Sequence, residues 1–177
     1  MPIRRYVLTG APGAGKTTLI DALRERGHSV VAEAATDVIA RRQAAGLGED
    51  DDTFLQEILE LQVARERAAV AGVVFFDRSP LCTLALARYL DRPVPRALRA
   101  AADRSTATYQ REAFLVRPLG FVRRTAARRI SYADSLRFAA IHEQVYRSYG
   151  FTLVDVPKAA AGERVALLER VARSSLG

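Results

Sequence analysis

A glycine-rich segment near the amino terminus has the residue types and the spacing of a phosphate-binding loop. Residues Gly10–Thr17 read GAPGAGKT and match the Walker A pattern G-x-x-x-x-G-K-[S/T]. Glycines allow backbone angles that turn successive N–H groups around an anion, and a helix beginning near Lys16 directs its positive dipole end to the same point. We expect Lys16 to reach the β- and γ-phosphates and the Thr17 hydroxyl to bind magnesium. The predicted nucleotide-binding residues of this loop are Gly10, Gly13, Ala14, Gly15, Lys16, Thr17 and Thr18.

Asp77 and Arg78 directly follow the apolar run Val73–Phe76 and form a second candidate group. In a protein with a phosphate-binding loop, an acidic residue at the end of a neighbouring strand faces the magnesium ion. Asp77 would hold a metal-bound water or accept the proton of an attacking hydroxyl; the alternative is a charge that only favours the start of the next helix. Arg78 would direct its donors at phosphate or acceptor, or form a structural ion pair.

Glu33 and Asp37 are candidates for contact with an acceptor molecule, because Glu33 ends the second predicted strand. A carboxylate at that place would hydrogen-bond a substrate hydroxyl, or it would serve as a helix cap or an ion-pair partner. Asp37 lies on the following predicted helix with Arg41 and Arg42, and these side chains either line the same pocket or face solvent.

Five arginines lie within the segment 117–130, after the fourth predicted strand: Arg117, Arg123, Arg124, Arg128 and Arg129. The alternatives for this segment are a solvated basic loop and a patch that binds nucleic acid. Phe121 and Tyr132 are its only nearby aromatic residues, which is too few for base stacking. The sequence therefore argues against nucleic acid as a partner.

The pattern of apolar residues predicts strands that alternate with helices along the chain. The predicted strands are 6–9, 30–32, 73–76, 113–116 and 151–154. The predicted helices are 17–26, 36–45, 53–71, 80–90, 96–102, 132–149 and 163–174, with Thr36, Thr53 and Ser79 as N-caps. This alternation indicates one α/β domain over residues 1–177, with a mainly parallel sheet and helices on both faces. The acidic stretch Glu49–Asp52 is predicted to be an exposed loop.

The composition narrows the classes of function. With 27 basic and 20 acidic residues the formal net charge is +7, which favours anionic partners. The single cysteine, Cys82, excludes an intramolecular disulfide and, with only two histidines, the usual zinc sites. We expect Cys82 to be a small buried residue and His142 to be a surface or packing residue of its helix. No apolar run is long enough to span a membrane, and we expect a cytoplasmic protein.

The Walker A loop followed by a strand that ends in Asp77-Arg78 resembles the nucleoside and nucleotide kinase group of P-loop proteins. More closely, the chain resembles bacterial predicted ATPases grouped with the ribosylnicotinamide kinase domain of NadR-type proteins. The similarity spans nearly the whole length and includes the VVAEA strand, the segment FFDRSP and the segment YRSYGF before the fifth strand.

The resemblance implies a three-layer sandwich with strand order 2-3-1-4-5 and an arginine-rich lid at about 117–130. It implies ATP and Mg²⁺ as cofactors, with Pro157-Lys158 near the adenine ring. The implied catalytic residues are Lys16, Asp77, Arg78 and Arg128, and the lid residues implied to bind nucleotide are Arg124 and Arg129. Relatives often carry an acidic residue shortly before the lid arginine, whereas here Thr125–Ala127 precedes Arg128.

Two functions fit these features. The first is a magnesium-dependent kinase that transfers the γ-phosphoryl group of ATP to a hydroxyl of a nucleoside-like or other small metabolite. The alternative is a regulatory ATP-binding NTPase, or switch, that acts with a macromolecular partner. The sequence argues against a guanine-specific switch, because its Asn-Lys-x-Asp base reader needs an asparagine and this chain has none, while an adenine-using switch stays open.

Lys16→Ala should abolish phosphoryl transfer, because the motif places this ammonium on the phosphates that carry the developing charge. The expected loss of rate is about 100-fold or more. Steady-state ADP production by parent and variant measures it, and activity within threefold of the parent would contradict the assignment of the loop.

Overall fold

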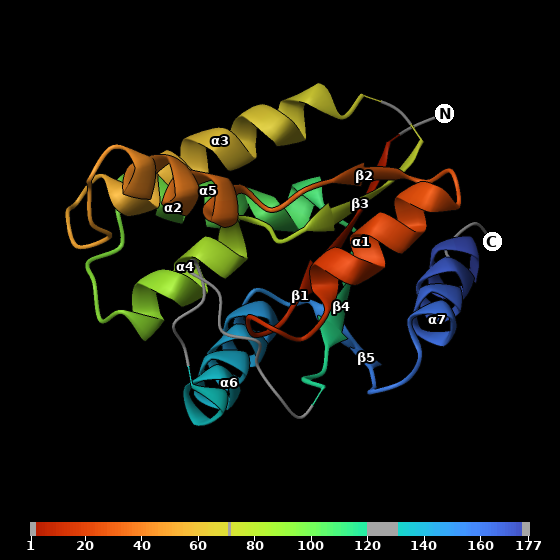
Figure 1. Ribbon diagram of the computed structural model, residues 1–177. Helices are drawn as coiled ribbons and strands as arrows, with labels where there is room; N and C mark the ends of the chain where they lie inside the picture. Colours follow the sequence, from red (N-terminus) through yellow and green to blue (C-terminus); the bar gives the residue numbers. More distant parts are fainter. Residues whose placement is uncertain (1–2, 71, 120–130, 175–177) are drawn as a thin grey trace.

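The computed structural model describes residues 3–70, 72–119 and 131–174, which form an alternation of strands and helices (Figure 1). The strands are β1 Arg4–Thr9, β2 Ser29–Val31, β3 Val73–Asp77, β4 Glu112–Val116 and β5 Thr152–Val156. The helices are α1 Lys16–Glu25, α2 Ala34–Ala44, α3 Phe54–Ala68, α4 Pro80–Tyr89, α5 Arg96–Thr108, α6 Tyr132–Ser148 and α7 Ala161–Ser174. No described helix is both long enough and apolar enough to cross a lipid bilayer.

The five strands form one parallel sheet in the order β2-β3-β1-β4-β5, as the family resemblance implied. The register pairs Leu8 of β1 with Asp77 of β3. Because the carboxyl ends of parallel strands meet at one edge of a sheet, this register places Asp77 beside the phosphate-binding loop that follows β1. The fold thus brings together two segments that are 60 residues apart in sequence.

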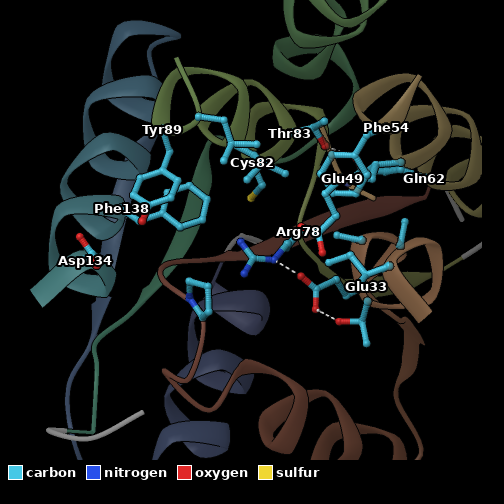
Figure 2. A pocket seen from close by; sticks show the side chains of 18 residues that line it. Glu33, Glu49, Phe54, Gln62, Arg78, Cys82, Thr83, Tyr89, Asp134 and Phe138 are labelled. Carbon is cyan, nitrogen blue, oxygen red and sulfur yellow. Dashed lines mark hydrogen bonds and ion pairs between the residues drawn. The ribbon is translucent and has the colours of Figure 1, made fainter. Parts of the chain in front are cut away.

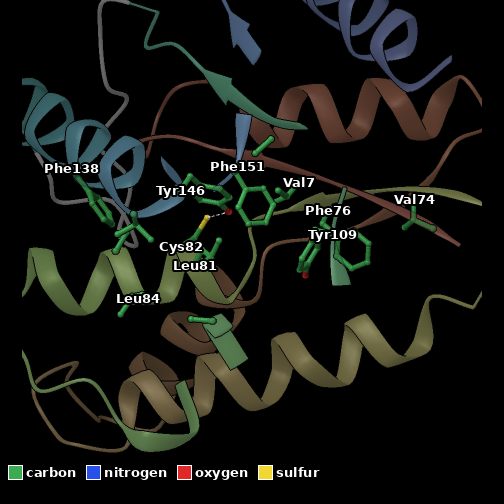
Figure 3. Packing of buried hydrophobic residues seen from close by; sticks show 14 residues of the cluster. Val7, Val74, Phe76, Leu81, Cys82, Leu84, Tyr109, Phe138, Tyr146 and Phe151 are labelled. Atoms are coloured by element: carbon green, nitrogen blue, oxygen red, sulfur yellow. Dashed lines mark hydrogen bonds between the residues drawn. The ribbon is translucent and has the colours of Figure 1, made fainter. Parts of the chain in front are cut away.

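Both faces of the sheet are covered, which explains why its central strands are apolar at nearly every position. Successive residues of a strand point to opposite faces. Tyr6 and Leu8 therefore pack in the cluster formed with α1 and α7, whereas Val7 packs in the cluster formed with α4 and α6. Figure 3 shows this second cluster, where Tyr146 of α6 lies over Cys82 of α4.

A third apolar cluster joins α2, α3, α4 and α5 to one another and does not include the sheet. Its buried members are Ala34, Val38, Phe54, Leu55, Ile58, Leu59, Ala87, Leu98 and Ala101. We call these four helices the helical lobe; α4 also packs against the sheet in the second cluster.

Several predicted helix ends differ from the structure. Helix α5 continues to Thr108 rather than Ala102, because its buried face continues through Ser105. Helix α2 begins at Ala34 with Glu33 at the N-cap position, so the prediction of Thr36 as the N-cap was wrong. Ser79 is confirmed as the N-cap of α4, where its hydroxyl accepts a hydrogen bond from the N–H of Leu81.

The acidic stretch 49–52 is an exposed loop, as the sequence predicted, but ion pairs fasten it to the segments beside it. Arg42, buried within α2, forms ion pairs with Asp51 and Glu57 and donates a hydrogen bond to the carbonyl of Gly48. Arg92 pairs with Asp50 from the other side. A buried guanidinium needs such partners, so Arg42 is a structural residue that fastens this loop rather than a pocket residue.

Gly10→Ala should destabilise the protein far more than Gly27→Ala, although both glycines have positive φ, at 124° and 85°. A Cβ on Gly10 would lie 2.6 Å from the carbonyl oxygen of Val116, whereas a Cβ on Gly27 meets nothing within 4 Å. We expect a loss of about 1 kcal/mol for Gly27→Ala from backbone strain alone, and at least about 2 kcal/mol more for Gly10→Ala. Urea denaturation measures both, and equal losses would show that the contact with Val116 relaxes without cost.

Candidate functional site

The phosphate-binding loop connects β1 to α1, and Gly15 occupies the N-cap position of α1 in the left-handed conformation. The motif therefore has the strand–loop–helix context that it requires, and the positive end of α1 faces the loop. Lys16 is the first helical residue and Thr17 and Thr18 follow it at the exposed mouth of the loop.

Lys16 lies buried within the loop, where its Nζ donates hydrogen bonds to the carbonyl oxygens of Gly10, at 3.0 Å, and Ala11, at 2.7 Å. Burial, reinforced by the neighbouring Arg78 guanidinium, lowers the pKa of Lys16 from 10.5 to about 7. The ammonium is thus held at the place where the motif needs it, although its charge is poorly stabilised before an anion arrives.

The side-chain oxygens of Thr17 and of Asp77, at the end of β3, lie together beside the loop. The Thr17 hydroxyl donates to Asp77 Oδ2 at 3.3 Å, while the buried Oδ1 of Asp77 has no hydrogen-bond partner. Burial raises the pKa of Asp77, opposed by the charge of Lys16. A buried carboxylate oxygen without a partner, next to a hydroxyl, fits Mg²⁺ or a water bound to it.

No group of three or more histidine, cysteine or acidic side chains that could hold a metal occurs in the described part of the chain. Mg²⁺ does not need one, because it usually keeps several waters and binds through one or two protein oxygens together with substrate phosphates. The residues present therefore fit a magnesium ion that arrives with a nucleotide.

Arg78 forms an ion pair with Glu33 that joins the ends of β2 and β3. Its Nη1 also lies 3.3 Å from the carbonyl oxygen of Gly10 and 3.2 Å from His142 Nε2. Burial alone would raise the pKa of Glu33, but the charges of Arg78 and Lys16 outweigh burial and hold it at about 2. Glu33 is therefore ionised at any physiological pH.

His142 belongs to this cluster, although the sequence predicted only a surface or packing residue. It is fully buried on α6, and its Nδ1 lies 2.9 Å from the carbonyl oxygen of Phe138. A carbonyl only accepts, so Nδ1 carries the proton and Nε2 accepts from Arg78. Burial and Arg78 hold the pKa of His142 well below its usual value, so the ring stays neutral. The sequence offers only its spacing from Phe138 as a sign that it points inward.

A cavity of about 330 Å³ opens beside the loop, between α2, α3, α4 and α6 (Figure 2). Pro12 of the loop and the Glu33–Arg78 pair form part of its wall. Its walls are mostly apolar and include Ile39, Phe54, Ile58, Cys82, Leu86, Tyr89, Leu90 and Phe138. The rings of Tyr89 and Phe138 stack with their centroids 4.6 Å apart.

Polar groups line the rest of the cavity. Gln62 and Thr83 lie at its base, where the Thr83 hydroxyl donates to Gln62 Oε1 at 3.1 Å. Glu49 comes from the fastened acidic loop and Asp134 from the first turn of α6. Arg78 is the only basic side chain that lines the cavity among the described residues, and it is already paired with Glu33.

Other residues singled out in the sequence lie elsewhere. Asp37 is not in the cavity wall and pairs with Arg65 of α3. Arg117 pairs with Asp155 and Glu143, so it stabilises the chain after β4. The predicted lid residues Arg123, Arg124, Arg128 and Arg129 lie outside the described residues.

Comparison with known proteins agrees with this architecture. A family model described as "AAA domain" matches residues 5–164. Deoxyadenosine kinase from M. mycoides superposes with a TM-score of 0.62 at 14% identity, over 96% of this chain and 98% of that one. Thymidylate kinase from Ehrlichia chaffeensis gives 0.58 at 12% identity, over 97% and 99% of the two chains.

Shikimate kinase from Acinetobacter baumannii also has a TM-score of 0.58 at 12% identity, covering 98% of this chain and 94% of that chain. The curated proteins contain no match to the sequence. At these identities the solved structures show a shared fold, the P-loop kinase fold with strand order 2-3-1-4-5.

ADP binding should weaken as the pH rises above 7, because the free protein must protonate Lys16 before the loop carries its full positive charge. With a pKa of about 7 in the free protein and a charged Lys16 in the complex, the affinity should fall about 20-fold between pH 7.5 and 9. Phosphate itself titrates near pH 6 and contributes little over this range. Calorimetric titration measures the affinity, with Lys16→Met as a variant whose weaker binding should not depend on pH. An equal affinity of the parent at both pH values would contradict the lowered pKa.

Proposed function

The chain belongs to the AAA domain family, and on that premise we propose that it is a kinase that transfers the γ-phosphoryl group of ATP to a hydroxyl of a small acceptor. The observation that carries the proposal is the cavity, since Pro12 of the phosphate loop lines it together with Glu33 and Arg78. A pocket that borders the phosphate-binding loop is what transfer to a small molecule requires.

On the nucleotide side, Lys16 and the loop N–H groups hold the phosphates. Thr17 and Asp77 would hold Mg²⁺, which would neutralise the negative charge that develops on the phosphates. Asp77 Oδ1 is the protein atom available for this role. We propose Arg124, Arg128 and Arg129 as further contacts of the phosphates, on the family resemblance.

On the acceptor side, we assign the orienting carboxylate to Glu33 rather than to Asp77. Glu33 lines the cavity, whereas Asp77 does not. A pKa of about 2 makes Glu33 a weak base. Its role is therefore to accept a hydrogen bond from the acceptor hydroxyl and fix its direction, which suffices when phosphoryl transfer has a loose transition state. Arg78, held by Glu33 and His142, would stabilise negative charge on the transferring group.

The charges of the cavity favour an acceptor without phosphate or carboxylate groups. The only cation in its described wall is Arg78, which Glu33 already neutralises, while Glu49 and Asp134 add negative charge. The aromatic and apolar walls, with Gln62 and Thr83 at the base, suit a flat molecule with a polar edge. A nucleoside, the kind of acceptor named for the M. mycoides kinase, has these properties.

The narrower relationship to ribosylnicotinamide kinase domains stays a prediction. The regulatory NTPase is the second candidate. A regulatory NTPase does not need a pocket for a second small molecule beside the phosphate loop, so the cavity favours the kinase. The two differ in what stimulates turnover, since a kinase consumes ATP in proportion to a small acceptor and a regulatory ATPase responds to a macromolecule.

The decisive experiment measures ADP formation with Mg²⁺ and ATP against a panel of nucleosides, vitamins, sugars and amino alcohols. Mass spectrometry of the acceptor should show one added phosphoryl group. ADP formation that no acceptor raises above the rate with ATP alone would contradict the kinase.

With an acceptor found, Glu33→Gln should lower kcat/KM for it about 100-fold, a larger loss than the accompanying loss of ADP affinity. Asp77→Asn should lower kcat as strongly and raise the Mg²⁺ concentration needed for half-maximal rate. Asp37→Asn is the matched control on the same lobe, and its kinetics should equal those of the parent. Loss in Asp37→Asn equal to that in Glu33→Gln would remove the special role of Glu33.

A further inference from the structure

Arg164, in the first turns of α7, is buried against the outer side of the phosphate-binding loop, with 3% of the residue exposed. Its Nη1 donates to the carbonyl oxygen of Ala14 at 3.1 Å. If Gly15 carried a Cβ, that atom would lie 3.1 Å from Arg164 Nη1, so the guanidinium packs directly against the backbone of the loop. The functional roles assigned above do not involve this residue.

The contact with Ala14 fixes the direction of one peptide group. A trans peptide is planar, with its C=O and N–H pointing in opposite directions. No described peptide bond is cis. When Arg164 holds the carbonyl of Ala14 on the outer side, the N–H of Gly15 must point away from Arg164, toward the interior of the loop. That N–H is one of the donors that the Walker A loop offers to phosphate.

The same guanidinium binds two more backbone carbonyls. Its Nη2 donates to the carbonyl oxygen of Arg117 at 3.1 Å and lies 3.5 Å from that of Val156. Arg117 follows β4 and Val156 ends β5, so one side chain connects the phosphate loop with the ends of both strands on its far side. The two nitrogens of the planar fork make this possible, and a lysine ammonium cannot reproduce it.

We propose that Arg164 is a positioning residue for nucleotide binding, which holds the Ala14–Gly15 peptide in the orientation that donates to phosphate. The inference rests on the proposed function only in that the loop binds a nucleotide. It does not depend on which acceptor is phosphorylated, or on whether one is.

The test compares three variants by calorimetric titration with ADP and with tripolyphosphate. Arg164→Ala removes the fork, Arg164→Lys keeps the charge without the fork, and Arg170→Met changes an exposed arginine on the same helix. We expect Arg164→Ala and Arg164→Lys each to weaken both ligands at least tenfold, and Arg170→Met to leave them unchanged. The loss for tripolyphosphate should match the loss for ADP, since the affected contact is to phosphate.

Two readouts separate positioning from a general loss of structure. Guanidinium ion at millimolar concentration should restore much of the ADP affinity of Arg164→Ala and none of that of Lys16→Ala. In ¹⁵N–¹H spectra, tripolyphosphate should shift the Gly15 amide strongly in the parent and weakly in Arg164→Lys. If Arg164→Ala does not fold, Arg164→Lys decides.

Parent-like affinity in Arg164→Lys overturns the proposal, as does a Gly15 amide that responds equally in both proteins. Failure of the proposed function looks different. In that case the parent phosphorylates no acceptor, while the dependence of ADP binding on Arg164 is still measurable.

Discussion

The ion pair between Glu33 and Arg78 is the interaction on which the rest of the site depends. It joins the ends of two neighbouring strands, and both side chains are more than four-fifths buried. Arg78 is also bonded to the phosphate loop at Gly10 and to His142 of α6, so one guanidinium aligns three parts of the molecule. Removing one partner of such a buried pair leaves an uncompensated charge and costs about 3–5 kcal/mol. The geometry of loop and cavity relative to each other is therefore fixed before any ligand binds.

Burial sets the electrostatic state of the two ionisable residues beside this pair. Lys16 and Asp77 lie beside it, and burial shifts both toward their neutral forms, lowering the pKa of Lys16 to about 7 and raising that of Asp77. A polyphosphate would favour the charged lysine, and a divalent cation would favour the charged aspartate. Binding of the polyphosphate thus favours the charged form of Lys16, and binding of the cation favours the charged form of Asp77. Both residues are fully ionised only when both ligands are bound.

Much of the fold could be predicted, because its signals are local. The glycine loop, the apolar runs and the Ser79 cap each occupy a few consecutive residues, while the strand order came from the family resemblance. The sequence could not reveal His142 or Arg164 as part of the site. Their partners lie 64 and 150 residues away, and no local pattern encodes such contacts. The sequence also left open whether Arg42 lines the pocket. The structure places it elsewhere, because its position is set by Asp51 and Glu57, which become its neighbours only in the folded chain.

The separation of the apolar clusters has a consequence for how such a protein diversifies. The cluster that supports the phosphate loop, between the sheet and α1 and α7, contributes no residue to the cavity wall. The cavity takes Phe54 and Ile58 from the helical lobe and Cys82 and Phe138 from the opposite face of the sheet. Since mutational effects at sites without shared partners are nearly additive, substitutions at Phe54 and Ile58 should leave the phosphate loop undisturbed. Gene duplicates of this domain could therefore change the ligand preference of the cavity independently of the nucleotide site, and a library confined to these two positions would explore that preference while the loop stays intact.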